Sequence, residues 1–358
     1  TDFALLNPNT HTCPTFRSQA DAELTRKIYR RAGVFIDEGK GEAGNPWGVR
    51  FARLFDMASD SGLFRTLRQL EAAGGIREGG DWRLPDGRRF VPLYEAKMAH
   101  HFDHRWATYE EDGQESRGCT LAEKGDAAFR PRPRYWVPQE EVESRLAAKG
   151  WQRGWLLGWR DICRSTDERT VIAGVVPRVG VGDKFLLAMP RQEATRWPAL
   201  MANFCALPLD YLARQKVGGT SLKYFTMKQL PILPPTAYTP ADLAFIVPRV
   251  LELTCTAHDL APFAADLGHP GPPFPWDPER RAVLRSELDA CFARLYGLSR
   301  DELRYILDPA DVLGPDYPSE TFRVLKNREM REYGEYRTAR LVLAAYDRLA
   351  GPASSFSL

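Results

Sequence analysis

Two apolar stretches, Trp155-Leu-Leu-Gly-Trp-Arg-Asp-Ile162 and Thr170-Val-Ile-Ala-Gly-Val-Val176, decide the fold expected for this chain. Each has the length of a buried strand and is rich in aromatic or β-branched residues. The polar segment 165–169 between them predicts a tight connection, and residues 184–189 predict a third strand. Trp155 and Trp159 fall on one face of the first strand, where we expect them to form core.

Further strands and helices are expected on both sides of this centre. Asp86-Gly87 predicts a hairpin turn between Trp82-Arg-Leu84 and Phe90-Val-Pro-Leu-Tyr94. The other signals are helical: a helix capped by Asp21 and running to Arg31, a helical pattern over 48–73, a helix over 197–212, one capped by Asp277, a capping box at Ser299-Arg-Asp-Glu302, and helices over 319–332 and 335–349.

The order of these elements predicts a mixed α/β fold in three parts. Residues 1–80 are expected to form a helical N-terminal connector, and 81–238 a mixed-sheet domain. Prolines over 230–235 suggest a domain edge, after which 239–358 read as a helical C-terminal region.

Composition excludes several classes of protein. The chain has 358 residues, of which 44% are hydrophobic and 27% charged, and a formal net charge of only +2, so charge must be judged locally. No apolar run is long enough to span a bilayer, and we expect a cytoplasmic protein without a membrane partner. Six cysteines without paired spacing (13, 119, 163, 205, 255 and 291) are expected to be reduced. A start at Thr1 fits a fragment of a longer polypeptide.

The tract Phe90–Tyr109 begins like a buried strand and then becomes polar. Lys97 and Arg105 are candidates for contacts to phosphates or to guanine edges, and His101 and His104 for neutral hydrogen bonds to DNA. A salt bridge from Arg105 to Asp103 or Glu95 is the structural alternative. Tyr94 and Phe102 are expected in the core.

Three other segments carry candidate DNA contacts. Arg130, Arg132 and Arg134 lie on a proline-stiffened extended segment and form the clearest local basic patch. Gly218-Gly-Thr-Ser-Leu-Lys223 offers backbone amides together with Thr220, Ser221 and Lys223 as phosphate partners. Arg169 either reaches DNA or locks the connection between the strands through Asp167 or Asp161.

Two alternative chemistries remain open in the same tract. The set His100, His101, Asp103 and His104 has the residue types of a metal site, but no further cluster of ligands is evident, so none is assigned. Asp81, Glu95 and Lys97 imitate a magnesium-dependent nuclease, in which two carboxylates hold the ion and lysine lies near the attacking water.

Five blocks in order give a family resemblance over nearly the whole chain: Leu6-Asn-Pro-Asn-Thr-His-Thr-Cys-Pro-Thr-Phe-Arg17, the tract 92–109, Trp159-Arg-Asp-Ile with Asp167-Glu-Arg-Thr-Val-Ile-Ala173, Gly219-Thr-Ser-Leu-Lys-Tyr-Phe with Gln229-Leu-Pro-Ile-Leu-Pro234, and Asp301-Glu-Leu-Arg-Tyr-Ile-Leu-Asp-Pro309 with later helical blocks. Together they resemble the C-terminal half of type IIG-like restriction–modification or phage-defence DNA adenine-N6 methyltransferases, which carries a TaqI-like target-recognition domain followed by helices. Ala96 stands where that family usually has glycine.

The resemblance implies a module that recognises double-stranded DNA for an upstream methyltransferase domain of the same polypeptide. It implies S-adenosyl-L-methionine as the cofactor of the parent enzyme and none in this chain. The chain lacks the Asn-Pro-Pro-aromatic motif, since Asn7-Pro-Asn-Thr10 has neither the second proline nor the aromatic residue. We therefore expect no methylation by this chain alone. The alternatives are the nuclease and a non-catalytic module for subunit assembly.

Overall fold

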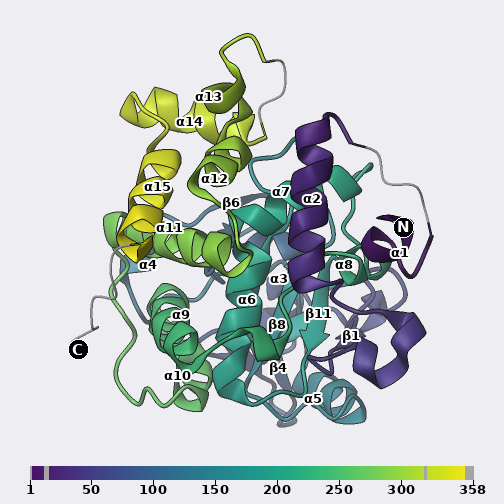
Figure 1. The fold of residues 1–358 in the computed structure, drawn as a ribbon. Helices are drawn as coiled ribbons and strands as arrows, with labels where there is room; N and C mark the ends of the chain where they lie inside the picture. The colour runs from purple at the N-terminus through teal and green to yellow at the C-terminus, as the bar shows by residue number, and fades with distance from the viewer. Residues whose placement is uncertain (1, 12–15, 318–320, 351–358) are drawn as a thin grey trace.

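The computed structural model describes residues 2–11, 16–317 and 321–350, and it is a mixed α/β protein (Figure 1). Cys13 and the predicted helix start at Ser319 lie outside these residues. The strands are β1 (Arg50–Ala52), β2 (Ile76–Glu78), β3 (Asp81–Arg83), β4 (Arg89–Tyr94), β5 (Ala107–Tyr109), β6 (Ser116–Gly118), β7 (Trp136–Pro138), β8 (Trp155–Arg160), β9 (Ala173–Pro177), β10 (Gly180–Val181) and β11 (Phe185–Met189).

The helices are most numerous in the C-terminal third. They are α1 (Asp2–Leu6), α2 (Gln19–Ala32), α3 (Leu67–Ala72), α4 (Leu121–Gly125), α5 (Gln139–Ala148), α6 (Trp197–Cys205), α7 (Leu207–Lys216), α8 (Tyr224–Lys228), α9 (Pro240–Thr254), α10 (Ala261–Asp266), α11 (Pro278–Leu295), α12 (Arg300–Leu307), α13 (Pro309–Leu313), α14 (Arg323–Tyr333) and α15 (Arg337–Ala350). Short 3-10 helices are η1 (Glu38–Gly44), η2 (Ser61–Leu63), η3 (Ala96–Met98), η4 (Ala194–Arg196), η5 (Pro235–Ala237) and η6 (His258–Leu260).

The centre of the molecule is an antiparallel sheet in the order β1-β11-β8-β9. Its middle strands are buried on both faces, and Trp155 and Trp159 are fully buried, as predicted. All nine residues of α6 are buried, because this helix packs against both β9 and α9; α9 lies next to it in Figure 1. Sheet and C-terminal helices thus share one core.

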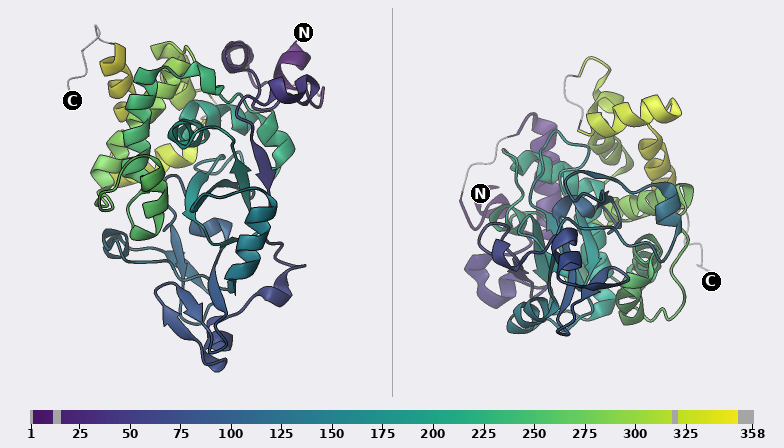
Figure 2. Two further views of the ribbon diagram at one scale, coloured as in Figure 1. Left: turned by 90° about the horizontal axis from the view of Figure 1, so that it is seen from below. Right: turned by 180° about the vertical axis from the view of Figure 1, so that it is seen from behind.

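A second sheet, in the order β10-β4-β3-β2 with β7 also paired to β4, projects away from the helical end (Figure 2). The predicted hairpin at Asp86-Gly87 is confirmed, with Gly87 at a φ of 86°. The outer strands enclose a small cluster of their own around Trp82, Phe90 and Trp136. A separate hairpin, β5–β6, follows the polar tract.

Several local predictions were wrong. The pattern over 48–73 is not one helix, because β1 pairs with β11 far along the chain and only α3 is helical there. Ser18 rather than Asp21 caps α2, and Asp21 accepts hydrogen bonds from two buried tyrosine hydroxyls instead. The helix over 197–212 breaks at Ala206, since Pro208 lacks the amide that a continuous helix would need. The caps at Asp277 and Ser299 are confirmed.

The three predicted parts do not pack as separate units. The boundary at residue 80 falls inside the β2–β3 hairpin, and β1 from the first part is a strand of the central sheet. One hydrophobic cluster runs from Leu6 to Ala345. Among the described residues no helix is long and apolar enough to cross a membrane, and five of the cysteines are free thiols.

The central sheet allows a stability test at Gly158. A Cβ at this position would lie 2.5 Å from the Leu186 carbonyl oxygen and 2.6 Å from the Phe185 ring. We expect Gly158→Ala to lower the free energy of unfolding by about 1–3 kcal/mol, measured by urea denaturation. Gly218→Ala is the matched control, because a Cβ there meets nothing within 4 Å. Equal stability of the two variants would contradict the sheet packing.

Candidate nucleic-acid interface

The predicted DNA contacts divide into exposed and buried groups. Exposed or half-buried are Lys97, Arg130, Arg132, Arg134, Thr220, Ser221 and Lys223, whereas His101, His104 and Arg105 are buried. The Arg169 side chain is only 11% exposed and is held in an ion pair. The two groups need separate explanations.

Lys97 and the arginines at 130–134 gather around strand β5. The Lys97 ammonium lies 4.4 Å from the centre of the Tyr109 ring, over its face. The backbone of Arg132 is tied to β5 by two hydrogen bonds, from Tyr109 N to Arg132 O (2.9 Å) and from Arg132 N to Thr108 Oγ1 (2.9 Å). These contacts place one lysine and the arginine-bearing segment side by side.

The cations in this group differ in how far they are neutralised. Arg132 lies 3.3 Å from the Glu111 carboxylate, and Arg134 lies over the Tyr135 ring. Neither Lys97 nor Arg130 has an ion pair within the described part of the chain. Arg130 and Arg132 also line a groove of about 660 Å³ together with Thr108 and Tyr109. Free cations beside a groove suit phosphate contacts.

Tyr109 is itself positioned for structure rather than for titration. Its hydroxyl donates a hydrogen bond of 2.6 Å to the Glu95 carboxylate. Burial and this carboxylate raise the pKa of Tyr109 above its ordinary value. The uncharged Tyr109 ring therefore provides the aromatic face on which the Lys97 ammonium lies.

Arg105 is not a DNA contact, which corrects the prediction. It is 0% exposed, and its guanidinium donates to the carbonyl oxygens of Lys124 (2.7 Å), Asp126 (2.6 Å) and Thr256 (2.9 Å). The first two carbonyls belong to the end of α4, where a cation satisfies unpaired backbone acceptors. The structural alternative, a salt bridge from Arg105 to Asp103 or Glu95, is also absent among the described contacts. Asp103 instead accepts from the Arg105 amide and pairs with Lys124.

The two buried histidines are also structural. His101 Nε2 donates to the Val171 carbonyl over 2.6 Å, and burial together with Arg169 lowers its pKa well below the ordinary value. His104 Nε2 lies 2.8 Å from the Asp259 carboxylate. Both side chains are almost completely buried and bonded within the protein, so the structure does not offer either of them to a duplex on the outer surface. No group of three or more potential metal ligands occurs within the described ranges.

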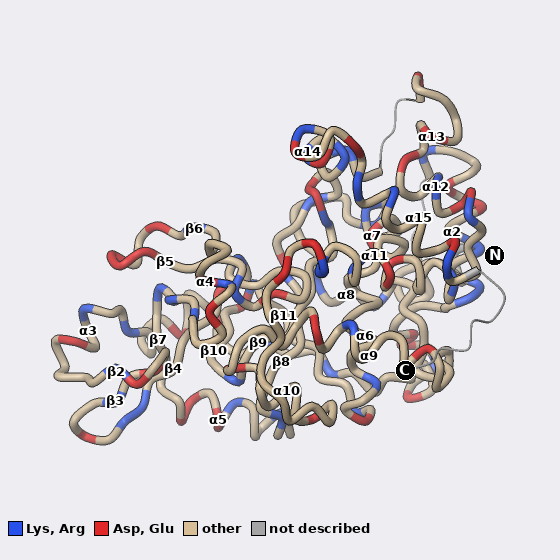
Figure 3. The backbone as a smooth tube through the Cα atoms, turned by 90° about the vertical axis from the view of Figure 1, so that its left-hand side faces the viewer, with Lys and Arg blue, Asp and Glu red and all other residues tan. Residues whose placement is uncertain are grey.

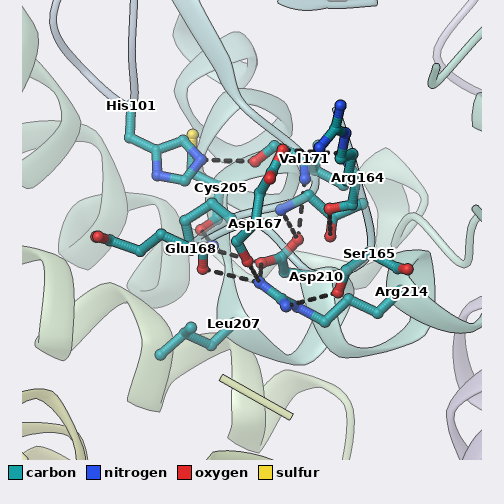
Figure 4. A network of polar contacts seen from close by, with 12 residues as sticks. His101, Arg164, Ser165, Asp167, Glu168, Val171, Cys205, Leu207, Asp210 and Arg214 are labelled. Carbon is teal, nitrogen blue, oxygen red and sulfur yellow. Dashed lines mark hydrogen bonds and ion pairs between the residues drawn. The ribbon is translucent and has the colours of Figure 1, made fainter. Parts of the chain in front are cut away.

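Arg169 locks the connection between β8 and β9, but through neither of the two predicted acids. Its Nε donates to Asp210 Oδ2 over 2.8 Å, and its Nη2 donates to the Cys205 carbonyl. Figure 4 shows the two acceptors, Asp210 and Cys205, within this network. Asp210 Oδ1 accepts from the backbone amides of Thr170 (2.8 Å) and Val171 (2.9 Å). One buried carboxylate on α7 thus holds the whole connection.

The segment 218–223 lies beside the end of β8. Ser221 bridges Ile162, the Leu222 amide donates to the Asp161 carbonyl over 2.7 Å, and Trp159 Nε1 donates to the Leu222 carbonyl. Lys97 approaches the same strand end, since Arg160 donates to the carbonyls of Lys97 and Ala99. Thr220 and Lys223 are exposed there.

The carboxylates of the nuclease alternative do not come together. Trp82 pairs with Phe90, so Asp81 lies opposite Val91, and Glu95 is four residues farther along the chain. At ~3.3 Å per residue the Cα atoms of the two residues are separated by roughly 13 Å along the strand direction, so the two side chains are not neighbours across the sheet. Glu95 is already bound to Tyr109.

A cavity that the sequence did not reveal lies on the other side of α4. It holds about 390 Å³ and is walled by His100 and Trp106 from the polar tract and by α11, α14 and α15. Leu121 of α4 lines this cavity, while Glu123 of the same helix lines the groove near Arg130. Trp106 is 42% exposed and stacks on His100 with a centroid separation of 4.2 Å.

In comparisons with known proteins, no family model and no curated protein matches this sequence.

The Asp210 cluster predicts a large effect from a nearly isosteric change. Asp210→Asn leaves the buried Arg169 without its counter-ion, so we expect the free energy of unfolding to fall by about 3 kcal/mol or more. Asp347→Asn, which breaks the exposed pair with Arg300, is the control and should cost at most about 1 kcal/mol. Chemical denaturation measures both, and similar losses would argue against a central role for Asp210.

Asp289, in the wall of the cavity, predicts a pH dependence. Burial raises its pKa to about 6, so the folded state keeps this proton to a higher pH than the unfolded chain does. Its contribution to stability is therefore greatest below about pH 4 and is lost as pH rises through about 6. Asp289→Asn keeps an acceptor for the Leu207 amide, which binds Oδ1 at 2.7 Å. The variant should gain stability relative to the parent between pH 4.5 and pH 7, and a pH-independent difference would contradict this.

Proposed function

We propose that this chain binds double-stranded DNA as the target-recognition part of a DNA adenine-N6 methyltransferase of a restriction–modification or defence system. The observation that carries the proposal is the cluster of exposed and half-buried cations around β5, in which Lys97 and Arg130 form no ion pair within the described residues. The ordered sequence blocks supply the class of parent enzyme.

The cation cluster supports DNA rather than a small acidic ligand because of its extent. Lys97 and the 130–134 arginines are spread along a tract and an adjoining groove, and do not converge on one point. Spaced, partly neutralised cations match a row of backbone phosphates, which sets register on the duplex. The β5–β6 hairpin lies beside them (Figure 3); its strand β5 is buried, whereas β6 and most of the turn between the strands are exposed.

We assign no S-adenosyl-L-methionine site to the two glycine-rich segments of the described chain. Gly39, Gly41 and Gly44 lie in a 3-10 helix, and Gly218-Gly219 follow a helix, so neither segment forms the strand–glycine loop–helix that the cofactor needs in this enzyme class. No methyl-transfer step is assigned to the chain, and the cofactor belongs to the proposed upstream domain. That domain, like the DNA, is a proposed partner.

A second candidate function, subunit assembly, is favoured by one observation. Large apolar side chains are exposed on consecutive C-terminal helices, namely Val312, Leu313, Val324, Met330 and Tyr333. Exposed apolar residues close together on a surface are typical of protein interfaces. Such a surface is compatible with DNA binding elsewhere on the molecule.

Duplex binding at several salt concentrations tests the proposal. We expect Lys97→Ala and Arg130→Ala each to weaken binding and to reduce the slope of log K against log salt by about 1, because each removes about one phosphate contact. Arg30→Ala is the control, since this exposed residue lies on α2, at the opposite end of the molecule from β5 (Figure 3). Filter binding or fluorescence anisotropy measures the slopes.

Two results would count against DNA recognition. One is an absence of duplex binding at low salt by the folded chain, and the other is an unchanged slope in both variants. Binding of another protein that survives both substitutions, without DNA affinity, would favour the assembly function.

A further inference from the structure

Five arginines converge on the cavity between the polar tract and the C-terminal helices: Arg169, Arg281, Arg285, Arg328 and Arg337. Four carboxylates, Asp103, Glu168, Asp289 and Glu329, lie in the same walls. Nearly all of these charged groups have a partner within the described residues, but one of the arginines has none.

The carboxylates are occupied by other groups. Asp103 pairs with Lys124 at 2.6 Å, and Glu168 with Arg328 at 2.9 Å. Glu329 accepts from the amide and hydroxyl of Thr338 at 2.7 and 2.6 Å. Asp289 accepts from the Leu207 amide. None of these carboxylates forms an ion pair with Arg285 among the described residues.

Four of the five arginines are occupied as well. Arg169 is bound to Asp210, Arg328 to Glu168 and Arg337 to Glu279. Arg281 donates to the carbonyls of Leu253 and Phe102. Within the described residues, Arg285 alone of the five has neither a hydrogen bond nor an ion pair, and it is exposed to the solvent of the cavity.

The surroundings of Arg285 contain charges of both signs. Desolvation by the surrounding helices and the nearby Arg169 and Arg328 lower the pKa of Arg285, while Asp289 and Glu168 raise it. The guanidinium itself is exposed in the cavity and makes no hydrogen bond within the described residues, so its donors are available to an anion. The cavity also offers neutral donors: Ser286 lies on the next position of α11, and burial lowers the pKa of His100 so that its imidazole is neutral.

We propose that this cavity binds a phosphate group, with Arg285 as its principal ligand. A guanidinium presents two parallel N–H donors that match phosphate oxygens, and an anion at Arg285 would stay near Arg328 as well. The volume of about 390 Å³ is in the range of small-molecule sites and exceeds the needs of a bare ion. The phosphate belongs either to a free nucleotide or to a nucleic-acid strand.

The inference does not depend on duplex binding at β5. Leu121 of α4 lines the cavity and Glu123 lines the groove. Arg130 lines the groove, Lys97 lies over Tyr109 at its edge, and neither cation lines the cavity. A failure of one site therefore leaves the other testable.

Titration of the folded chain with four probes tests this site: inorganic phosphate, adenosine monophosphate, adenosine and a short single-stranded oligonucleotide. Trp106 and Trp276 line the cavity, so tryptophan fluorescence reports binding, with calorimetry as confirmation. We expect saturable binding of phosphate-bearing probes and none of adenosine. Binding of phosphate and the monophosphate identifies a free-ligand site, whereas binding of the oligonucleotide alone identifies a strand site.

Arg285→Gln should weaken binding about tenfold or more, the change expected from losing a charge-assisted hydrogen bond. It should leave thermal stability unchanged or higher, since Arg285 makes no contact that folding needs. Arg280→Gln is the control on the same helix, because Arg280 pairs with Glu252 outside the cavity. Absence of saturable binding by every phosphate-bearing probe, or equal affinity of Arg285→Gln and the parent, would overturn the proposal. Lys97→Ala should not alter phosphate binding.

Discussion

A single buried carboxylate, that of Asp210, organises the centre of this protein. It accepts from the amides of Thr170 and Val171 and pairs with Arg169, so the connection between β8 and β9 has one conformation over α7 (Figure 4). Arg214, one turn later on α7, donates to the carbonyls of Ser165, Asp167 and Glu168 in the same connection. Backbone groups that would otherwise be buried without partners are thus satisfied by side chains of one helix.

Consequences of this arrangement extend to both candidate sites. The Val171 carbonyl receives His101, which fixes the polar tract against the central sheet. From there Arg105 ties the tract to the end of α4 and to Thr256. Glu168, held in the same connection, pairs with Arg328 of α14 and so helps to shape the wall of the arginine cavity. The Asp210 carboxylate on α7 therefore helps to position residues that are far apart in the sequence.

Many charged residues in this chain serve as internal crosslinks to carbonyl oxygens. Arg105, Arg178, Arg214 and Arg281 all donate to main-chain acceptors at the ends of helices or in loops. Carbonyl partners make the burial of such a guanidinium possible because they satisfy its terminal donors, although the Nε groups of Arg105 and Arg214 have no partner among the described residues. Lys97, Arg130 and Arg285 lack such partners within the described residues, and they carry the functional proposals because each lies at the groove or in the cavity.

The sequence alone was enough to predict those elements that depend only on neighbouring residues. The Asp86-Gly87 turn, the caps at Asp277 and Ser299 and the apolar strand 155–160 each depend on neighbouring residues, and the mixed α/β class follows from them. Tertiary structure alone decided β1, which needs β11 as a partner, and the burial of His101, His104 and Arg105, whose partners lie up to 155 residues away. The cavity around Arg285 was equally hidden from the sequence, because its arginines come from three separate regions of the chain. A charged side chain looks the same in a sequence whether it faces solvent or a buried carbonyl, and only the packing of distant segments makes the difference.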